Sequence, residues 1–172
     1  MKRYPTSFVV LAGCLLAFIS GGLNALEADK SEKIHSSHDG NLTMSTTGEF
    51  RILAMEENVK ITQGSLQITG DEAIFEYLLA SNELIRVTVT GSPVRYQQQL
   101  NTSGGLATGT SDSLLLYTEP ETGQNVLELI GTANISTPDS SMKCAAIVYL
   151  ADQDIIREAS GPCEGVINSQ PN

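Results

Sequence analysis

The stretch from residue 58 to residue 69 reads Asn58-Val59-Lys60-Ile61-Thr62-Gln63-Gly64-Ser65-Leu66-Gln67-Ile68-Thr69. Apolar and polar residues alternate on both sides of Gly64-Ser65, so each half has one apolar and one polar face. Alternation with a period of two is typical of half-buried β-strands, and a glycine-serine pair between two such runs is typical of a turn. The stretch therefore predicts an antiparallel hairpin with one apolar face.

The chain from Glu49 onward continues in this style, because short β-type runs alternate with turn residues and no window shows sustained helical periodicity. Three segments align on a tyrosine and on the glycine that follows it: Tyr77 and Gly91, Tyr117 and Gly131, Tyr149 and Gly161. The spacing is 14, 14 and 12 residues. Each segment is therefore interpreted as a hairpin with a small residue at its exit.

Hairpins of this kind cannot bury an apolar face singly, so each is expected to lay its face on the next. The fold class predicted from the residues is all-β, an elongated stack of hairpins that either closes as a sandwich or stays partly open. The residues expected to point into the apolar interior are Leu66, Ile68, Phe75, Tyr77, Leu115, Tyr117, Leu127, Leu129, Ile147 and Tyr149. The end strands of the stack would expose unpaired backbone groups that can accept another chain.

The N-terminus has the layout of a secretory signal peptide. The basic start Met1-Lys2-Arg3 precedes an apolar run from Phe8 to Ile19, which is too short for a membrane-spanning helix. We expect a signal peptide over residues 1–25, with cleavage after Ala25 or Ala28. The alternative is acylation of Cys14 in the lipoprotein-type box Leu11-Ala12-Gly13-Cys14, although the apolar run continues past that cysteine.

The remaining chain is expected to form one domain over residues 29–166, followed by a flexible tail over 167–172. The polar stretch 28–38 is expected to be mobile. Without residues 1–25, which hold two basic and no acidic residues, the net charge changes from −10 to 8 − 20 = −12. Charge this negative argues against attraction to nucleic acid or to anionic membrane surfaces.

Two cysteines, Cys144 and Cys163, remain after the signal peptide. A hairpin turning near residues 151–154 would bring them onto neighbouring strands within a residue or two of register. In an oxidising exported compartment this pair predicts a disulfide, and the alternative is two free buried thiols.

Every common catalytic pattern is missing from the sequence. The only histidines, His35 and His38, have no cysteine or acidic cluster nearby to complete a metal site. No nucleophile elbow and no glycine-rich phosphate loop is present. We therefore expect a protein that is not an enzyme and that holds neither a metal nor a cofactor.

Three segments resemble the OstA-like (LptA) family of periplasmic lipopolysaccharide-transport bridge proteins. Residues 57–73, from Glu57-Asn58-Val59 to Asp71-Glu72-Ala73, resemble the family pattern G-N-V-x-V-x-Q-G-x-x-x-x-A-D-x-V. Residues 91–96 resemble G-x-P-A-x-F, and residues 111–117 resemble A-x-x-x-x-Y. The resemblance covers Ile34 to Gly165, with departures at Glu57, at Gly70 and in the Cys144/Cys163 pair.

The resemblance implies a V-shaped, open β-jellyroll in the periplasm that shelters the lipid A acyl chains of lipopolysaccharide. It also implies head-to-tail self-association and pairing with the OstA-like domains of an inner-membrane LptC-like and an outer-membrane LptD-like partner. The leading groove candidates by the family pattern are Ile34, Ile61, Tyr96 and Tyr117. The complete set of expected groove residues is Ile34, Leu53, Met55, Val59, Ile61, Leu66, Ile68, Phe75, Tyr77, Tyr96, Leu115, Tyr117, Leu127, Leu129, Ile147 and Tyr149.

Two alternatives come from other functional classes. A closed β-sandwich with a structural or adhesive role would show the same strands, with a filled core and no affinity for lipid. A lipoprotein enzyme or assembly factor would need an acylated Cys14 and a catalytic set that the sequence does not reveal.

Overall fold

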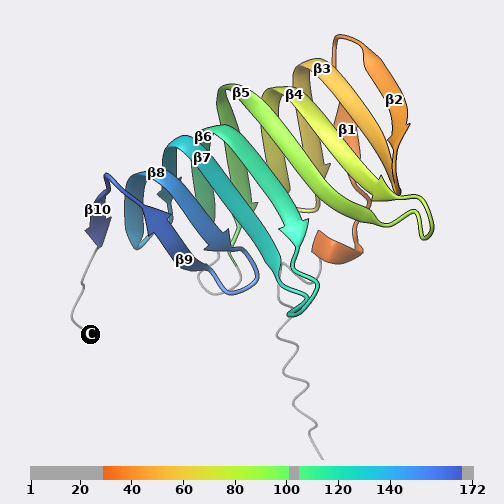
Figure 1. The fold of residues 1–172 in the computed structure, drawn as a ribbon. Helices are drawn as coiled ribbons and strands as arrows, with labels where there is room; N and C mark the ends of the chain where they lie inside the picture. Colours follow the sequence, from red (N-terminus) through yellow and green to blue (C-terminus); the bar gives the residue numbers. More distant parts are fainter. Residues whose placement is uncertain (1–28, 101–104, 168–172) are drawn as a thin grey trace, which may run out of the picture.

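The computed structural model describes residues 29–100 and 105–167. Its strands form one antiparallel sheet of ten strands in the order β1-β3-β4-β5-β6-β7-β8-β10, with β2 also paired to β3 and β9 to β8 (Figure 1). The strands are β1 His35–Ser37, β2 Leu42–Thr47, β3 Phe50–Gln63, β4 Leu66–Leu78, β5 Leu84–Gln99, β6 Leu106–Thr118, β7 Asn125–Ser136, β8 Ser140–Leu150, β9 Ile155–Ser160 and β10 Glu164–Ile167.

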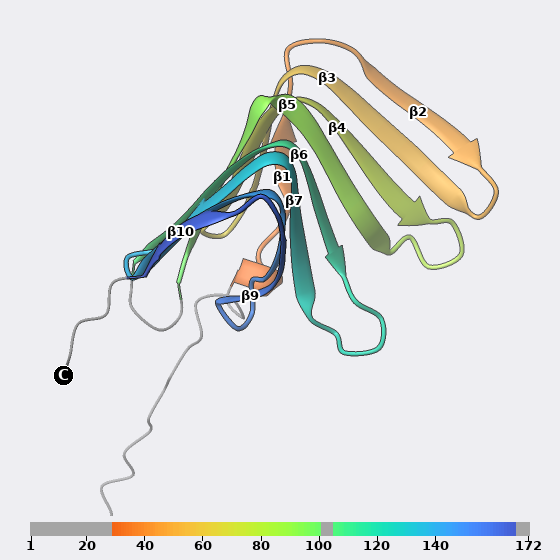
Figure 2. The same ribbon diagram turned by 60° about the vertical axis from the view of Figure 1, so that its left-hand side comes forward.

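The six long strands, β3 to β8, bend at their middles, so the sheet folds into two arms (Figure 2). The register of each pair from β3–β4 to β7–β8 shifts near its middle, for example between Glu56 and Val59 of β3 and between Ile130 and Ala133 of β7. Such bulges bend a strand and increase its twist, and a row of them across a sheet produces a crest. The first arm contains residues 50–56, 72–78, 84–90, 113–118, 125–130 and 146–150, and the second contains 59–63, 66–70, 94–99, 106–111, 133–136 and 140–144.

Two short strands complete each edge of the sheet. At one edge β2 pairs with the first-arm half of β3 and β1 with its second-arm half. At the other edge β9 pairs with the first-arm half of β8 and β10 with its second-arm half. Both arms therefore run the full width of the sheet, and both ends of the sheet remain open.

The core occupies the inner face of the bend, between the arms. It combines first-arm residues such as Phe75, Leu127 and Tyr149 with second-arm residues such as Ile68 and Tyr96. The sequence prediction of an all-β fold in the form of an open V is confirmed. The closed sandwich of the alternative interpretation is wrong, because one bent sheet encloses the core and does not close on itself.

The hairpin predicted over residues 58–69 is confirmed as the junction of β3 and β4. Gln63 pairs with Leu66 across a two-residue turn in which Gly64 has a φ of 57°. The small residues predicted at the hairpin exits lie at the crest: Gly91 and Gly131 fall within register shifts, and Gly161 separates β9 from β10. The repeat therefore marks the length of an arm.

The inward direction predicted for Leu115 and Tyr117 is wrong. Leu114 is in the core and Leu116 packs against it, so Leu115 and Tyr117, which alternate with them along β6, face the other side of the sheet. The Tyr117 hydroxyl donates a hydrogen bond to Glu128 Oε1 at 2.6 Å on that outer face. A shift of one residue reverses every side chain of a strand, and alignment on tyrosine chose the wrong parity for β6.

Residues 28–38 were expected to be mobile, but the structure shows regular elements within the described residues 29–38. Residues 29–31 form a helical turn, and β1 pairs His35 to Ser37 with Thr62 to Lys60 of β3. The expected signal peptide and Cys14 lie outside the described residues. Within residues 29–100 and 105–167, no helix is long and apolar enough to cross a membrane.

The predicted disulfide is confirmed between Cys144 and Cys163. β10 aligns Glu164 with Lys143 of β8, which places the two cysteines opposite each other at the crest. The disulfide joins the last strand to the centre of β8.

Candidate functional site

A cavity of about 330 Å³ lies between the two arms. Leu84, Val87 and Leu116 line it from the first arm, and Ile61 and Leu66 line it from the second. Each of these side chains packs within or against the core, so the cavity continues the apolar inner face of the sheet. The remaining lining residues are Asp29, Lys30, Ile34, Gln63, Ile85, Arg86, Gln98, Tyr117, Thr118, Gly123, Asn125 and Ala151.

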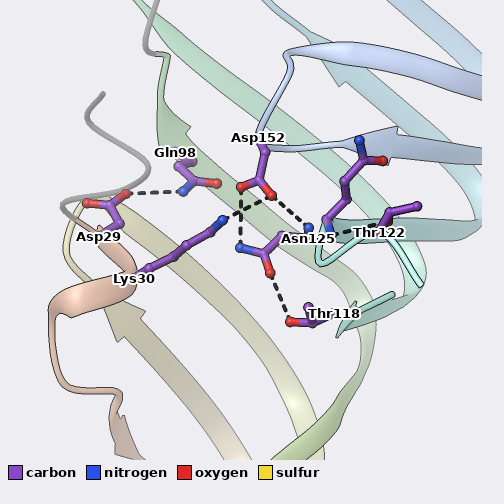
Figure 3. A network of polar contacts seen from close by, with 8 residues as sticks. Asp29, Lys30, Gln98, Thr118, Thr122, Asn125 and Asp152 are labelled. Atoms are coloured by element: carbon purple, nitrogen blue, oxygen red, sulfur yellow. Dashed lines mark hydrogen bonds and ion pairs between the residues drawn. The ribbon is translucent and has the colours of Figure 1, made fainter. Parts of the chain in front are cut away.

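Residues 29–34, which we call the strap, contribute Asp29, Lys30 and Ile34 to the lining of this cavity, and their helical turn lies between the free ends of the two arms (Figure 2). Asp29 fastens the strap to the second arm (Figure 3). Its carboxylate accepts hydrogen bonds from the Ser65 backbone N–H at 2.8 Å, from Ser65 Oγ at 2.6 Å and from Gln98 Nε2 at 3.1 Å. The bonds satisfy a carboxylate whose residue is only 8% exposed.

Lys30 fastens the strap to the first arm. Its Nζ lies 3.1 Å from Asp152 Oδ2, in the turn between β8 and β9 (Figure 3). The same carboxylate accepts a hydrogen bond from the Asn125 backbone N–H at 2.8 Å. Two successive residues of the strap therefore hold opposite arms.

Two tyrosines of the core, one from each arm, carry neutral hydroxyl groups. Tyr96 donates to Gln98 Oε1 at 3.0 Å, and Tyr149 donates to Asp154 Oδ1. Burial raises the pKa of Tyr96 well above its ordinary value, and burial together with the bond to Asp154 raises the pKa of Tyr149. Both hydroxyls stay protonated at neutral pH and act as hydrogen-bond donors in an apolar interior.

Most of the predicted groove residues lie on the inner face. Leu53 and Tyr77 pack against the core, and Ile34 of the strap lines the cavity. Leu115 and Tyr117 are on the outer face as described above, although Tyr117 contributes to the cavity rim. The predicted residues that are buried in the core are Met55, Val59, Ile61, Leu66, Ile68, Phe75, Tyr96, Leu127, Leu129, Ile147 and Tyr149.

Several cavity residues were missed by the sequence prediction. Leu84 and Val87 lie in a run of apolar residues typical of a strand, which could have identified them. Leu116 was missed because the prediction placed its neighbours Leu115 and Tyr117 on the inner face. The strap residues Asp29 and Lys30 carry no pattern that could have revealed their role.

The cavity offers apolar contact from its aliphatic side chains together with polar groups such as Lys30, Arg86 and Gln98. Among the described residues, no group of three or more His, Cys, Asp or Glu side chains could hold a metal ion. A site lined by aliphatic and polar side chains suits an amphiphile, whose apolar part can contact the aliphatic side chains.

The family model described as "LptA/(LptD N-terminal domain) LPS transport protein" matches residues 42–155, which is more than half of the chain. The chain belongs to this family. Within the LptA-like family, the solved structures include LptH from Pseudomonas aeruginosa, described as the LptA homologous periplasmic component of the lipopolysaccharide transport device. That structure is 20% identical, covers 83% of this chain and 99% of its own, and superposes with a TM-score of 0.65, so it shows that the fold is shared. Comparison with curated protein sequences gives no significant match.

Proposed function

We propose that this LptA-like chain binds lipopolysaccharide in the periplasm and holds the lipid A acyl chains between its two arms. The observation that carries the proposal is the cavity lined by aliphatic side chains from both arms, within a bent sheet that does not close on itself. Each CH₂ group that leaves water for such a surface contributes about 0.8 kcal/mol. The sugars and their phosphates would remain outside, because the chain without its expected signal peptide carries a net charge of 8 − 20 = −12.

Two neighbouring leucines of β6 test this binding mode. A photo-crosslinking amino acid at Leu116, which lines the cavity, is expected to form a lipopolysaccharide adduct in cells that make this lipid. The same amino acid at Leu115, half-buried on the opposite face, is expected to form none. Immunoblots of irradiated cells measure both adducts.

Exposed Lys60 provides a second negative position on β3. Adducts at Leu115 and Lys60 as strong as at Leu116 would mean nonspecific contact. No adduct at Leu116 at normal protein level would contradict acyl-chain binding.

We further propose that copies of the chain join head to tail and extend from an inner-membrane LptC-like partner to an outer-membrane LptD-like partner. Support comes from the two open edges of the sheet, because an unpaired strand edge can add a strand from another chain. Exposed apolar side chains accompany both edges, with Leu42 and Met44 on β2 and Val166 on β10. Joining unlike edges would continue the inner faces into one apolar path.

The edge contact has its own test. A photo-crosslinking amino acid at Val166, on the edge strand β10, is expected to produce dimers and higher oligomers of the purified protein. At Ile74, an exposed aliphatic position on β4, which is paired on both sides within the sheet, it is expected to produce few or none. Denaturing gels after irradiation measure the crosslinked dimers and higher oligomers as a ladder of bands. Equal ladders at both positions would contradict edge pairing.

A further inference from the structure

We propose that the strap, residues 29–34, is a gate that closes the cavity mouth and that opens by releasing Lys30 from Asp152 while Asp29 stays bound to the second arm. The inference rests on the proposed function, since it describes how an amphiphile reaches the cavity. In this proposal, the strap opens before the amphiphile binds in the cavity.

The strap contacts both arms through side chains, with Asp29 bound to the second arm and Lys30 paired with Asp152 of the first. Its helical turn sits between the lower ends of the two arms (Figure 2). The side chain of Ile34 lines the cavity and is 42% exposed, so the strap also covers the apolar wall from the solvent side. Separation of the strap from the first arm at Lys30 would change access to the cavity without breaking any long strand.

The attachment to the second arm is the strong one. Three hydrogen bonds reach the buried Asp29 carboxylate, and Gln63 Nε2 donates to the Glu32 carbonyl at 3.1 Å. The turn beneath is tightly fitted, because a Cβ at Gly64 would lie 2.1 Å from Asp29 Oδ1. Hydrogen bonds to a buried carboxylate are stronger than bonds between neutral groups.

The attachment to the first arm is the weaker one. The Lys30 and Asp152 side chains are 34% and 17% exposed, so water and salt screen their attraction. Asp152 also keeps its hydrogen bond from the Asn125 backbone when Lys30 leaves, so its carboxylate retains a partner. The strap should therefore release at Lys30 first.

The test compares two lysines of the strap. Lys30→Gln removes the ion pair, and Lys33→Gln makes the same change at an exposed position of the same segment. With the fluorescent fatty acid cis-parinaric acid as probe, Lys30→Gln is expected to load about two- to fivefold faster than wild type, the range for loss of a partly exposed ion pair. Lys33→Gln should load like wild type. Added salt should speed loading of wild type and of Lys33→Gln, and change Lys30→Gln little.

A second measurement needs no ligand. The chain contains no tryptophan, so Ile34→Trp introduces a single indole into the strap. Acrylamide quenching of that indole is expected to increase about twofold when Lys30→Gln is added, and to stay unchanged with Lys33→Gln. Equal quenching in the two backgrounds, or equal loading rates, would overturn the gate.

The two measurements separate the gate from the proposed function. If wild type takes up neither cis-parinaric acid nor lipid A, acyl-chain binding fails, and the quenching comparison still decides whether the strap opens at Lys30. If wild type binds and the variants behave alike in both measurements, binding stands and the gate fails. Circular dichroism of each variant verifies that the sheet is intact.

Discussion

Replacing Phe75 with alanine is expected to lower the free energy of unfolding by about 3–5 kcal/mol, the loss typical of a buried phenylalanine. Phe75 is 2% exposed and lies on the inner face of β4, with Leu53 of β3 and Val87 of β5 as its cross-strand neighbours. Its removal leaves a cavity in the core between the two arms. Urea unfolding, read at the transition midpoint with an unchanged slope, measures the loss.

Ile74 is the matched control for this substitution. It precedes Phe75 on the same strand, faces the other side of the sheet and is 41% exposed. Ile74→Ala is expected to cost about 1 kcal/mol or less, since this side chain lies outside the core and is already partly in water. Equal losses at the two positions would contradict the assignment of the inner face as the core.

Strand alternation allowed much of the inner face to be predicted before the structure was known. Val59, Ile61, Leu66 and Ile68 alternate with polar residues, so their common face was unambiguous, and all four are buried. The run Leu114-Leu115-Leu116 has no alternation, and nothing within it shows which leucine faces inward. The tyrosine alignment then placed Leu115 inside, and burial of Leu114 shows the opposite.

The strap illustrates what local pattern cannot reveal. Asp29 binds residues 36 and 69 positions away, Ser65 and Gln98. Contacts of that range depend on the bend of the sheet, which arises where register shifts in successive strand pairs line up. A row of bulges is a property of the assembled sheet, so the meeting of Asp29 and Lys30 with opposite arms could not be derived from either residue.

Removal of the disulfide is expected to have the second large effect, a loss of about 3 kcal/mol in the free energy of unfolding. The bond between Cys144 and Cys163 closes a loop with a sequence separation of 19, for which chain entropy in the unfolded state predicts that magnitude. Cys144→Ala with Cys163→Ala tests the value by urea unfolding. Reductant should lower the stability of wild type toward that of the double variant and leave the double variant unchanged.

The same bond should determine whether β10 remains on the sheet. β10 has four residues, all exposed, and its contacts are its pairing with residues 140–143 of β8 and the adjacent disulfide. So short an edge strand gains little from burial, and its ordering entropy of about 1–2 kcal/mol per residue must be offset by the covalent link. The double variant should therefore show rapid hydrogen exchange at Val166 and, if β10 supplies the edge for the next copy, a weaker crosslinked ladder from that position. Unchanged exchange at Val166 would mean that backbone pairing alone holds β10.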